Sequence, residues 1–308
     1  MPQPSSNRTA RRGRPGFSRA ADAVVRRAIA LCGWLAIAIL GAIFAFLLFN
    51  ALKAIRETGL LSMVRGADWY PTADPAKYGF LPSEVGSIWV TGVALVSAVP
   101  IGILAAIYLS EFAKGRFKDV AKSIVEFMAA VPSVVLGLLG VAYLAPVIQK
   151  TFGLESGLTA LTAGIVVGVM TLPTIISISE DALYSVPAAM RQGSLALGNT
   201  NWQTTYKVVV PAASSGIFAA VMLGLGRAIG ETMVVLMLAG NSGLVPRSPL
   251  EAARTMTGTI AQEMGEVVRG GTHFSVLFAM GLVLFAITFA VNLAADVVLE
   301  RQRKRWRR

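Results

Sequence analysis

Residues 86–109 read GSIWVTGVALVSAVPIGILAAIYL, which is 24 consecutive residues without a charged side chain. An α-helix rises 1.5 Å per residue, so about 20 such residues are enough to cross the ~30 Å hydrocarbon core of a membrane. Five further apolar runs lie at residues 29–48, 127–148, 158–179, 214–239 and 274–295. The runs do not alternate with polar residues, as the strands of a membrane barrel must. The sequence therefore predicts an all-α polytopic membrane protein with about six transmembrane helices.

The composition excludes an ordinary soluble domain. Of the 308 residues, 55% are hydrophobic and only 15% are charged, whereas a soluble domain carries about a quarter charged residues. The mean hydropathy is +0.64. A chain with so few charges, grouped between long apolar runs, cannot cover a soluble core with a polar surface.

The 28 Lys and Arg residues are distributed unevenly between the two sides of the predicted helices, and the formal net charge is +11. Nineteen lie before the first run, after the last, or in the loops that follow the second and fourth; eight lie on the other side. Because positive residues favour the cytoplasmic side, both termini are expected in the cytoplasm. This placement also makes nucleic-acid binding the weaker interpretation. The basic tails, residues 1–28 and 299–308, are expected to be drawn to anionic lipid headgroups.

The charge pattern predicts the following order along the chain. A first transmembrane helix at 29–52 is retained as an anchor, because its apolar run is longer than that of a signal peptide. An extracytoplasmic loop at 53–85 follows, rich in proline and aromatic residues, and is expected to be a folded connector or a contact surface for an external partner. Residues 86–298 form a five-helix core with a cytoplasmic loop at 181–213. The single Cys32 and the single His273 provide neither a disulfide nor a metal site, and His273 is expected to be a surface residue.

Two charged residues interrupt the fifth apolar run. Arg227 falls at its midpoint, and Glu231 follows four residues later, so a continuous helix would place both on one face as a pair. Ala220 and Gly224 continue that face and would allow it to border a cavity. Charged residues at this depth are costly and usually face a bundle interior or a wet path. The alternatives are an ion pair that only locks helix packing and an anion path lined by Arg227, with Thr232 as an additional hydroxyl donor.

The cytoplasmic loop contains a short helical pattern from Ala188 to Leu197, which Gly198 is expected to end. Such a helix can lie on the membrane or dock on a soluble partner. The segment resembles the EAA motif of ABC importer permeases, because Gly198 is followed by nine residues and then Val208-Val-Val-Pro211. The resemblance implies a type I ABC importer permease fold, in which this loop is the coupling helix that seats on the ATPase.

The first half of the motif departs from the family pattern, since Gln192-Gly193-Ser194 stands where Glu-Ala-Ala is expected. The loss of the acidic residue leaves an uncharged edge. The resemblance nevertheless implies that Gln192, Gly193, Ser194, Leu197 and Gly198 contact a separate ATPase subunit.

The stretch LGLGRAIGETM at residues 223–233 is similar to the fifth-helix motif of phosphate-specific permeases, particularly those of the PstC type. The resemblance implies that Arg227 and Glu231 serve phosphate movement. It also implies three kinds of partner: a PstA-type permease, PstB-type ATPase subunits and an extracytoplasmic PstS-type phosphate-binding protein. No Gly-Lys dipeptide occurs, so no P-loop can form, and ATP is expected to be used by the partner without a cofactor on this chain. Permeases for sulfate or molybdate, and an ATPase-independent channel or secondary transporter, remain the alternatives.

Overall fold

The computed structural model describes residues 17–306, so parts of the tails at 1–28 and 299–308 fall outside the described residues. The chain divides into two compact units, Met1–Phe49 and Asn50–Arg308. The first unit contains most of helix α1 (Phe17–Glu57), whose apolar side chains from Val24 to Phe46 are exposed. An exposed apolar helix of this length is suited to a lipid environment.

Six helical segments in the described part of the chain are long and apolar enough to span a membrane, which confirms the expected number. They are Ala21–Glu57, Leu81–Phe112, Ser133–Phe152, Ala160–Tyr184, Asn201–Gly230 and Thr272–Val297. Within and between them, the elements after α1 are α2 (Leu60–Arg65), β1 (Trp69–Tyr70), β2 (Lys77–Tyr78), α3 (Leu81–Ile107), α4 (Gly115–Ala130), α5 (Ser133–Leu139), α6 (Ala145–Phe152), α7 (Ala160–Tyr184), α8 (Ala188–Ala196), α9 (Asn201–Thr204), α10 (Val210–Gly230), α11 (Met233–Leu238), α12 (Met256–Glu263) and α13 (Thr272–Trp306). Three π-helical turns, η1 (Tyr108–Phe112), η2 (Gly140–Leu144) and η3 (Thr205–Val209), adjoin α3, α5 and α9.

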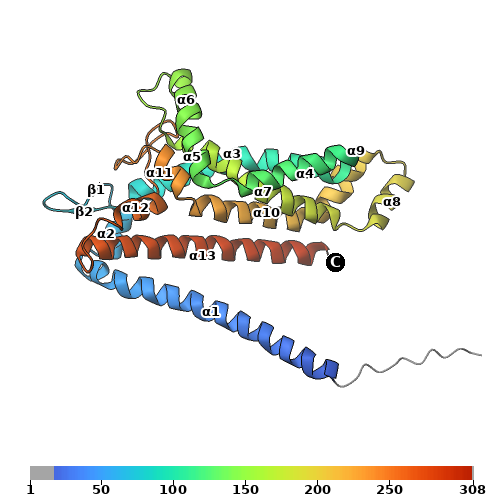
Figure 1. Ribbon diagram of the computed structural model, residues 1–308, viewed down its shortest axis with the longest axis horizontal. Coiled ribbons are helices and arrows are strands. Elements are labelled where there is room, and N and C mark those ends of the chain that lie inside the picture. The colour runs from blue at the N-terminus through green and yellow to red at the C-terminus, as the bar shows by residue number, and fades with distance from the viewer. Residues whose placement is uncertain (1–16, 307–308) are drawn as a thin grey trace, which may run out of the picture. The chain divides into compact units, whose positions relative to one another are not determined.

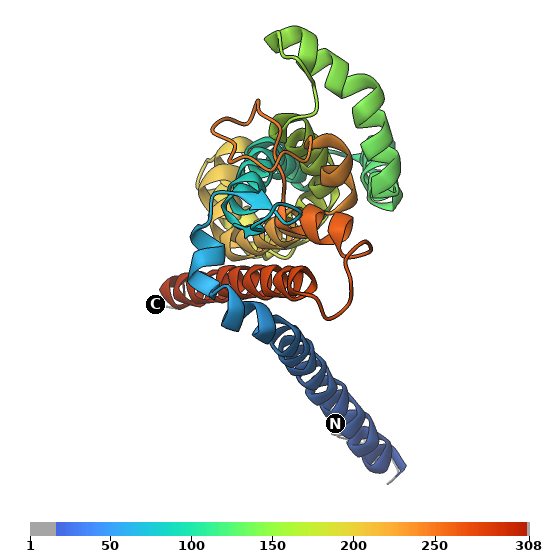
Figure 2. The same cartoon turned by 90° about the vertical axis from the view of Figure 1, so that its left-hand side faces the viewer.

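Helix α7 is the centre of the second unit, where α3 and α10 pack along it (Figures 1 and 2). Most of its residues are buried, in contrast to the other five spans. A cluster of buried side chains from α3, α7 and α11 forms one core, and it includes Val90, Val167 and Leu238. The end of α10 and the start of α11 are therefore held against an ordered scaffold.

The third span begins later than residues 127–148 predict. Helix α4 ends at Ala130, and Pro132 takes an extended conformation before α5 starts at Ser133. Proline lacks a backbone N–H and disfavours helix in the residue before it, so it separates two helices here. The residues before it form an amphipathic helix of their own, with Phe117 and Phe127 among its exposed apolar side chains.

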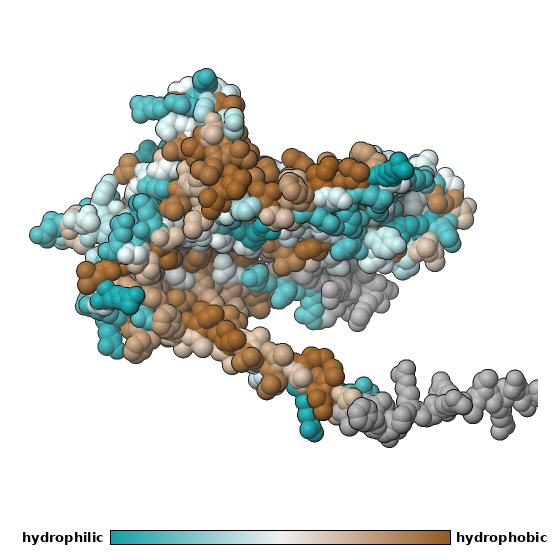
Figure 3. Space-filling model, in the orientation of Figure 1, coloured by the Kyte–Doolittle hydropathy of each residue, from teal (hydrophilic) through white to brown (hydrophobic). Residues whose placement is uncertain are grey.

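The connector between α1 and α3 is folded, as its prolines and aromatic residues predict. It contains α2 and a two-stranded antiparallel ribbon in which Trp69 pairs with Tyr78. Within the second unit, this ribbon and α12 lie at one end, and α8 and α9 lie at the opposite end (Figure 1). Hydrophilic residues gather at both ends, and apolar residues cover much of the face formed by α5 and its neighbours (Figure 3). This distribution matches a bundle that spans a membrane between two aqueous ends.

Candidate functional site

Arg227 lies in the last turn of α10, near the end of the span rather than at its midpoint. Its side chain is exposed in the single chain, and Nη1 donates a hydrogen bond of 3.3 Å to Oγ1 of Thr174 on α7. The C-terminal carbonyls of a helix favour a nearby cation. An exposed guanidinium at the end of a membrane helix retains free donors, which a bound anion can accept.

The face that was expected to border a cavity instead packs against α7. Ala220 and Gly224 are buried, and a Cβ at Gly224 would lie 2.8 Å from Cγ1 of Ile175. About two turns before Gly224, a Cβ at Gly216 would lie 2.4 Å from Cβ of Ala182. Small residues at four-residue spacing permit this close approach of two membrane helices. Arg227 therefore lies beside a helix–helix contact, where Thr174 is its neighbour.

The expected pair between Arg227 and Glu231 is not formed. Helix α10 ends at Gly230, and Glu231 has extended backbone angles of φ −67° and ψ 132°. Its Oε1 accepts a hydrogen bond of 3.3 Å from the N–H of Val234, and its carbonyl accepts one of 2.9 Å from Thr257 on α12. The four-residue spacing places two residues on one face only in a continuous helix, so the prediction of a pair was wrong.

Thr232 lies with Glu231 between the two helices and precedes α11 directly. Its hydroxyl donates to the carbonyl of Gly230 at 3.2 Å, so its proton is engaged within the chain. The break leaves non-helical backbone between α10 and α11. In membrane proteins such backbone occurs where it is buried in protein or lines a water-filled cavity. The break thus brings polar backbone, a carboxylate and a guanidinium to one short stretch of sequence.

The loop at residues 181–213 forms the helix–turn shape that its sequence predicts. Helix α8 is followed by Leu197 and Gly198, and the φ of +84° at Gly198 strongly favours glycine. Thr200 then begins α9, with a capping box to Gln203. Gln192 and Gly193 are exposed, and Leu197 has 86% of its surface exposed. These residues are available to a partner.

Ser194 differs from its neighbours because it faces the inside of the loop. It is buried, its Oγ lies 2.9 Å from Oγ1 of Thr204, and it accepts a hydrogen bond of 3.1 Å from Asn199. Its contacts hold α8 against α9. The contact surface expected at residues 192–198 therefore consists of exposed residues around an interior serine.

Sequence reasoning missed three residues that the fold places at these sites. Thr174 contacts Arg227 from α7, and Glu111 contacts Arg191 of α8 at 2.9 Å. The partners are 53 and 80 positions apart in the sequence, so no local spacing signals either contact. Only the charge of Glu111 next to an apolar run indicates a role.

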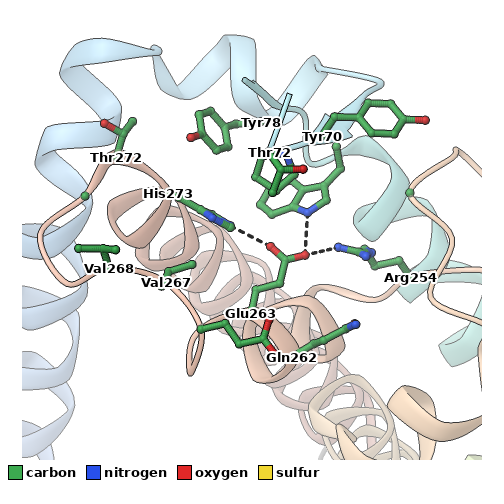
Figure 4. A pocket seen from close by; sticks show the side chains of 15 residues that line it. Tyr70, Thr72, Tyr78, Arg254, Gln262, Glu263, Val267, Val268, Thr272 and His273 are labelled. Carbon is green, nitrogen blue, oxygen red and sulfur yellow. Dashed lines mark hydrogen bonds and ion pairs between the residues drawn. The ribbon is translucent and has the colours of Figure 1, made fainter. Parts of the chain in front are cut away.

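A concave site of about 800 Å³ lies at the end of the unit that carries the ribbon. Glu263 is its centre: Oε1 accepts from Trp69 at 2.9 Å and from Arg254 at 2.5 Å, and Oε2 lies 2.8 Å from Nε2 of His273 (Figure 4). His273 is therefore not a free surface residue. Burial raises the pKa of the Tyr78 hydroxyl, and the carboxylate of Glu57 adds to this effect. Through these contacts, the carboxylate of Glu263 connects the segment before α3 to the start of α13.

Comparison of the sequence with known proteins places the chain in a family. Residues 98–308 match the family described as binding-protein-dependent transport system inner membrane component. The chain is 38% identical over 280 residues to the probable ABC transporter permease protein YqgH of Bacillus subtilis, covering 90% of this chain and 91% of that protein. It is 32% identical to the phosphate transport system permease protein PstC of Mesorhizobium japonicum (91% and 90% covered). Against PstC 1 of Mycobacterium tuberculosis the identity is 34%, with 82% and 85% covered.

Solved structures share the fold at lower identity. A bacterial alginate ABC transporter in complex with its alginate-bound periplasmic protein gives a TM-score of 0.62 at 14% identity, covering 91% of this chain and 96% of that chain. The methionine ABC transporter MetNI in an inward-facing conformation gives a TM-score of 0.58 at 19% identity, covering 72% and 96%. The fold is therefore that of a type I ABC importer permease, as the motif in the loop at residues 181–213 predicted.

Proposed function

Because the chain belongs to the family of binding-protein-dependent transport system inner membrane components, we propose that it is the phosphate-conducting permease subunit of an ATP-driven importer. It is a multi-pass protein of the inner membrane and works with an ATPase and a substrate-binding protein. The observation that carries the choice of phosphate is its identity of 32–34% to PstC permeases over more than four-fifths of the chain. A sulfate or molybdate permease and an ATPase-independent channel are not favoured. YqgH is described as an ABC transporter permease, and the two PstC proteins are phosphate permeases.

Arg227 is the residue proposed to meet phosphate in transit. Its guanidinium is exposed, presents a planar fork that matches an oxyanion, and has only Thr174 as a hydrogen-bond partner in the described part of the chain. Glu231, four residues later, is proposed to limit how tightly the anion is held, because a conducting path needs binding weak enough for release. Thr232 supports the break between the two helices.

The partners follow from the same proposal. A PstA-type permease would cover the exposed apolar faces of the second unit, and a PstS-type binding protein would deliver phosphate at the end that carries the ribbon. PstB-type subunits would bind and hydrolyse ATP against α8, so this chain would need no cofactor of its own. The exposure of Gln192, Gly193 and Leu197 supports this last contact.

Substitution of Arg227 tests the proposed function. Arg227→Gln is expected to abolish phosphate uptake while the complex still assembles and hydrolyses ATP, because the charge that attracts the anion is lost. Arg227→Lys is expected to recover little, since an ammonium cannot reproduce the fork. The measurements are uptake of labelled phosphate and ATPase activity in proteoliposomes. Wild-type uptake by Arg227→Gln would contradict the proposed role of Arg227. Uptake of sulfate but not phosphate by the unaltered complex would contradict the assignment of phosphate as the substrate.

A further inference from the structure

Arg191, on α8, connects the cytoplasmic loop to the ends of two membrane helices. Its Nη2 lies 2.9 Å from Oε1 of Glu111, and its Nε donates to Oε2 at 3.3 Å, so the two side chains meet fork to fork. The side chains are 24% and 12% exposed, so this pair is largely shielded from water. Pairs of this geometry are stronger and more directional than an ordinary surface ion pair.

The same guanidinium also binds the end of α7. Nη2 donates to the carbonyl of Leu183 at 2.8 Å, and Nη1 donates to the carbonyl of Val186. The last carbonyls of a helix have no partner within the helix, and a cationic side chain that satisfies them fixes the helix end. One side chain of α8 therefore contacts both the end of α7 and the π-helical turn that follows α3.

Glu111 belongs to the π-helical turn η1, which continues α3. Such turns are rare and occur frequently at functional sites. The next residue, Phe112, packs its ring 6.0 Å from the ring of Trp202 on α9. The turn η1 thus contacts both halves of the cytoplasmic loop, through Glu111 on one side and Phe112 on the other.

We infer that Arg191 and Glu111 are positioning residues that transmit movement of α8 to α3 and α7, and so couple ATP hydrolysis to the path beside Arg227. The inference rests on the proposed function, in which α8 contacts the ATPase. Thr174, the neighbour of Arg227, lies nine residues before Leu183 on the same helix, about 14 Å along its axis. A displacement of the end of α7 therefore reaches Thr174 through one continuous, mostly buried helix.

The first test measures phosphate moved per ATP hydrolysed by the whole complex in proteoliposomes. Arg191→Gln and Glu111→Gln are each expected to lower this ratio about tenfold while hydrolysis continues, a size typical of coupling between sites. The double variant is expected to fall no further, because either single change breaks the same contact. Arg191→Lys is expected to rescue little, since one ammonium cannot serve a carboxylate and two carbonyls. Arg116→Gln, at an exposed position on α4, is the matched control and is expected to retain the wild-type ratio.

A purely structural role for Arg191 predicts another result. The variants would then assemble less well, but the assembled fraction would keep the wild-type ratio, and that outcome would overturn the inference. If Arg191→Gln fails to assemble with the ATPase, Glu111→Gln decides the question, because it leaves both carbonyl contacts in place.

The second test does not depend on the substrate. A cysteine at Gly226, where an added Cβ meets nothing within 4 Å, reports the environment beside Arg227 in a Cys32→Ser background. Its labelling rate is expected to change on ATP binding in the otherwise unaltered complex and to lose this response with Arg191→Gln. A response that persists with Arg191→Gln would refute the positioning role of Arg191 and Glu111. A response that is lost, in a complex that moves no phosphate, would support this positioning role and refute phosphate as the substrate.

Discussion

Glu231 has two roles that substitution can separate, a negative charge and a hydrogen-bond acceptor for Val234. Glu231→Gln keeps an oxygen for this bond, so the complex is expected to melt at the wild-type temperature. Its maximal phosphate uptake is expected to fall, because an anion near Arg227 is no longer opposed by a carboxylate. Glu231→Leu removes the acceptor as well and is expected to cost about 1 kcal/mol of stability, the usual value for a lost hydrogen bond. Thermal unfolding and uptake kinetics of the two variants would be compared, and identical behaviour of both would contradict this separation.

Arg227 and Glu231 also show how far the sequence alone could predict the candidate site. Both residues stand out because charges are rare in an apolar run. Their relative position could not be predicted, because α10 ends between them, at Gly230. The backbone carbonyl of Glu231 there accepts a hydrogen bond from Thr257, which lies 26 positions further along the chain. Arg191 and Glu111 are a similar case, because their contact exists only once α3 and α8 are folded together.

At the scale of elements, the tight contact between α7 and α10 can be tested at one glycine. Gly216→Ala would place a Cβ 2.4 Å from Cβ of Ala182, so the helices must separate slightly. The expected cost is about 1–3 kcal/mol, as for other overpacked contacts. Gly226→Ala is the control, because its Cβ meets nothing within 4 Å, and alanine favours a helix by about 0.5–1 kcal/mol over glycine. Thermal denaturation of the purified complex measures both, and equal stability of the two variants would argue against close packing.

The loop that carries α8 offers a second test at this scale. Gly193→Arg and Leu197→Arg place a long charged side chain on the exposed face of α8 and are expected to prevent copurification of the ATPase. Ser194→Arg is not an equivalent test, because Ser194 is buried against Thr204 and its replacement disrupts the loop itself. Ser194→Ala, which removes only the hydroxyl contacts, is expected to leave ATPase binding intact and lower thermal stability. Normal ATPase binding by both arginine variants would favour a loop that lies on the membrane.

The spans could be predicted because apolarity is a local property that the bilayer imposes on every residue of a crossing helix. All six predicted runs overlap a spanning helix of the structure. Their ends were less predictable. The third moved because Pro132 separates α4 from α5, and the fifth begins earlier, at Asn201, and ends earlier, at Gly230, before the break at Glu231. Both shifts depend on backbone geometry that hydropathy does not encode.

At the scale of the whole molecule, the sidedness of the chain in the membrane remains a prediction from its charges. The ends of the second unit are distinct, because α8 and α9 lie at one and the ribbon and α12 at the other. The greater number of basic residues belongs to the side of α8, which the positive-inside rule assigns to the cytoplasm. ATP is available only on that side, so a docking surface on α8 requires this orientation.

Two exposed residues allow the orientation to be measured. Leu197, at the end of α8, is 86% exposed, and Val268, in the loop between α12 and α13, is 82% exposed. With Cys32→Ser as background, Val268→Cys is expected to react with a membrane-impermeant maleimide in intact cells, and Leu197→Cys only after the membrane is permeabilised. Both positions carry apolar side chains that face outward from the single chain, so each substitution leaves the core unchanged, and the permeabilised sample controls for expression. Labelling of Leu197→Cys, but not Val268→Cys, in intact cells would show that the chain has the opposite orientation in the membrane. It would place α8 where no ATPase can reach it, and the assignment of α8 as the coupling helix would fail together with the topology.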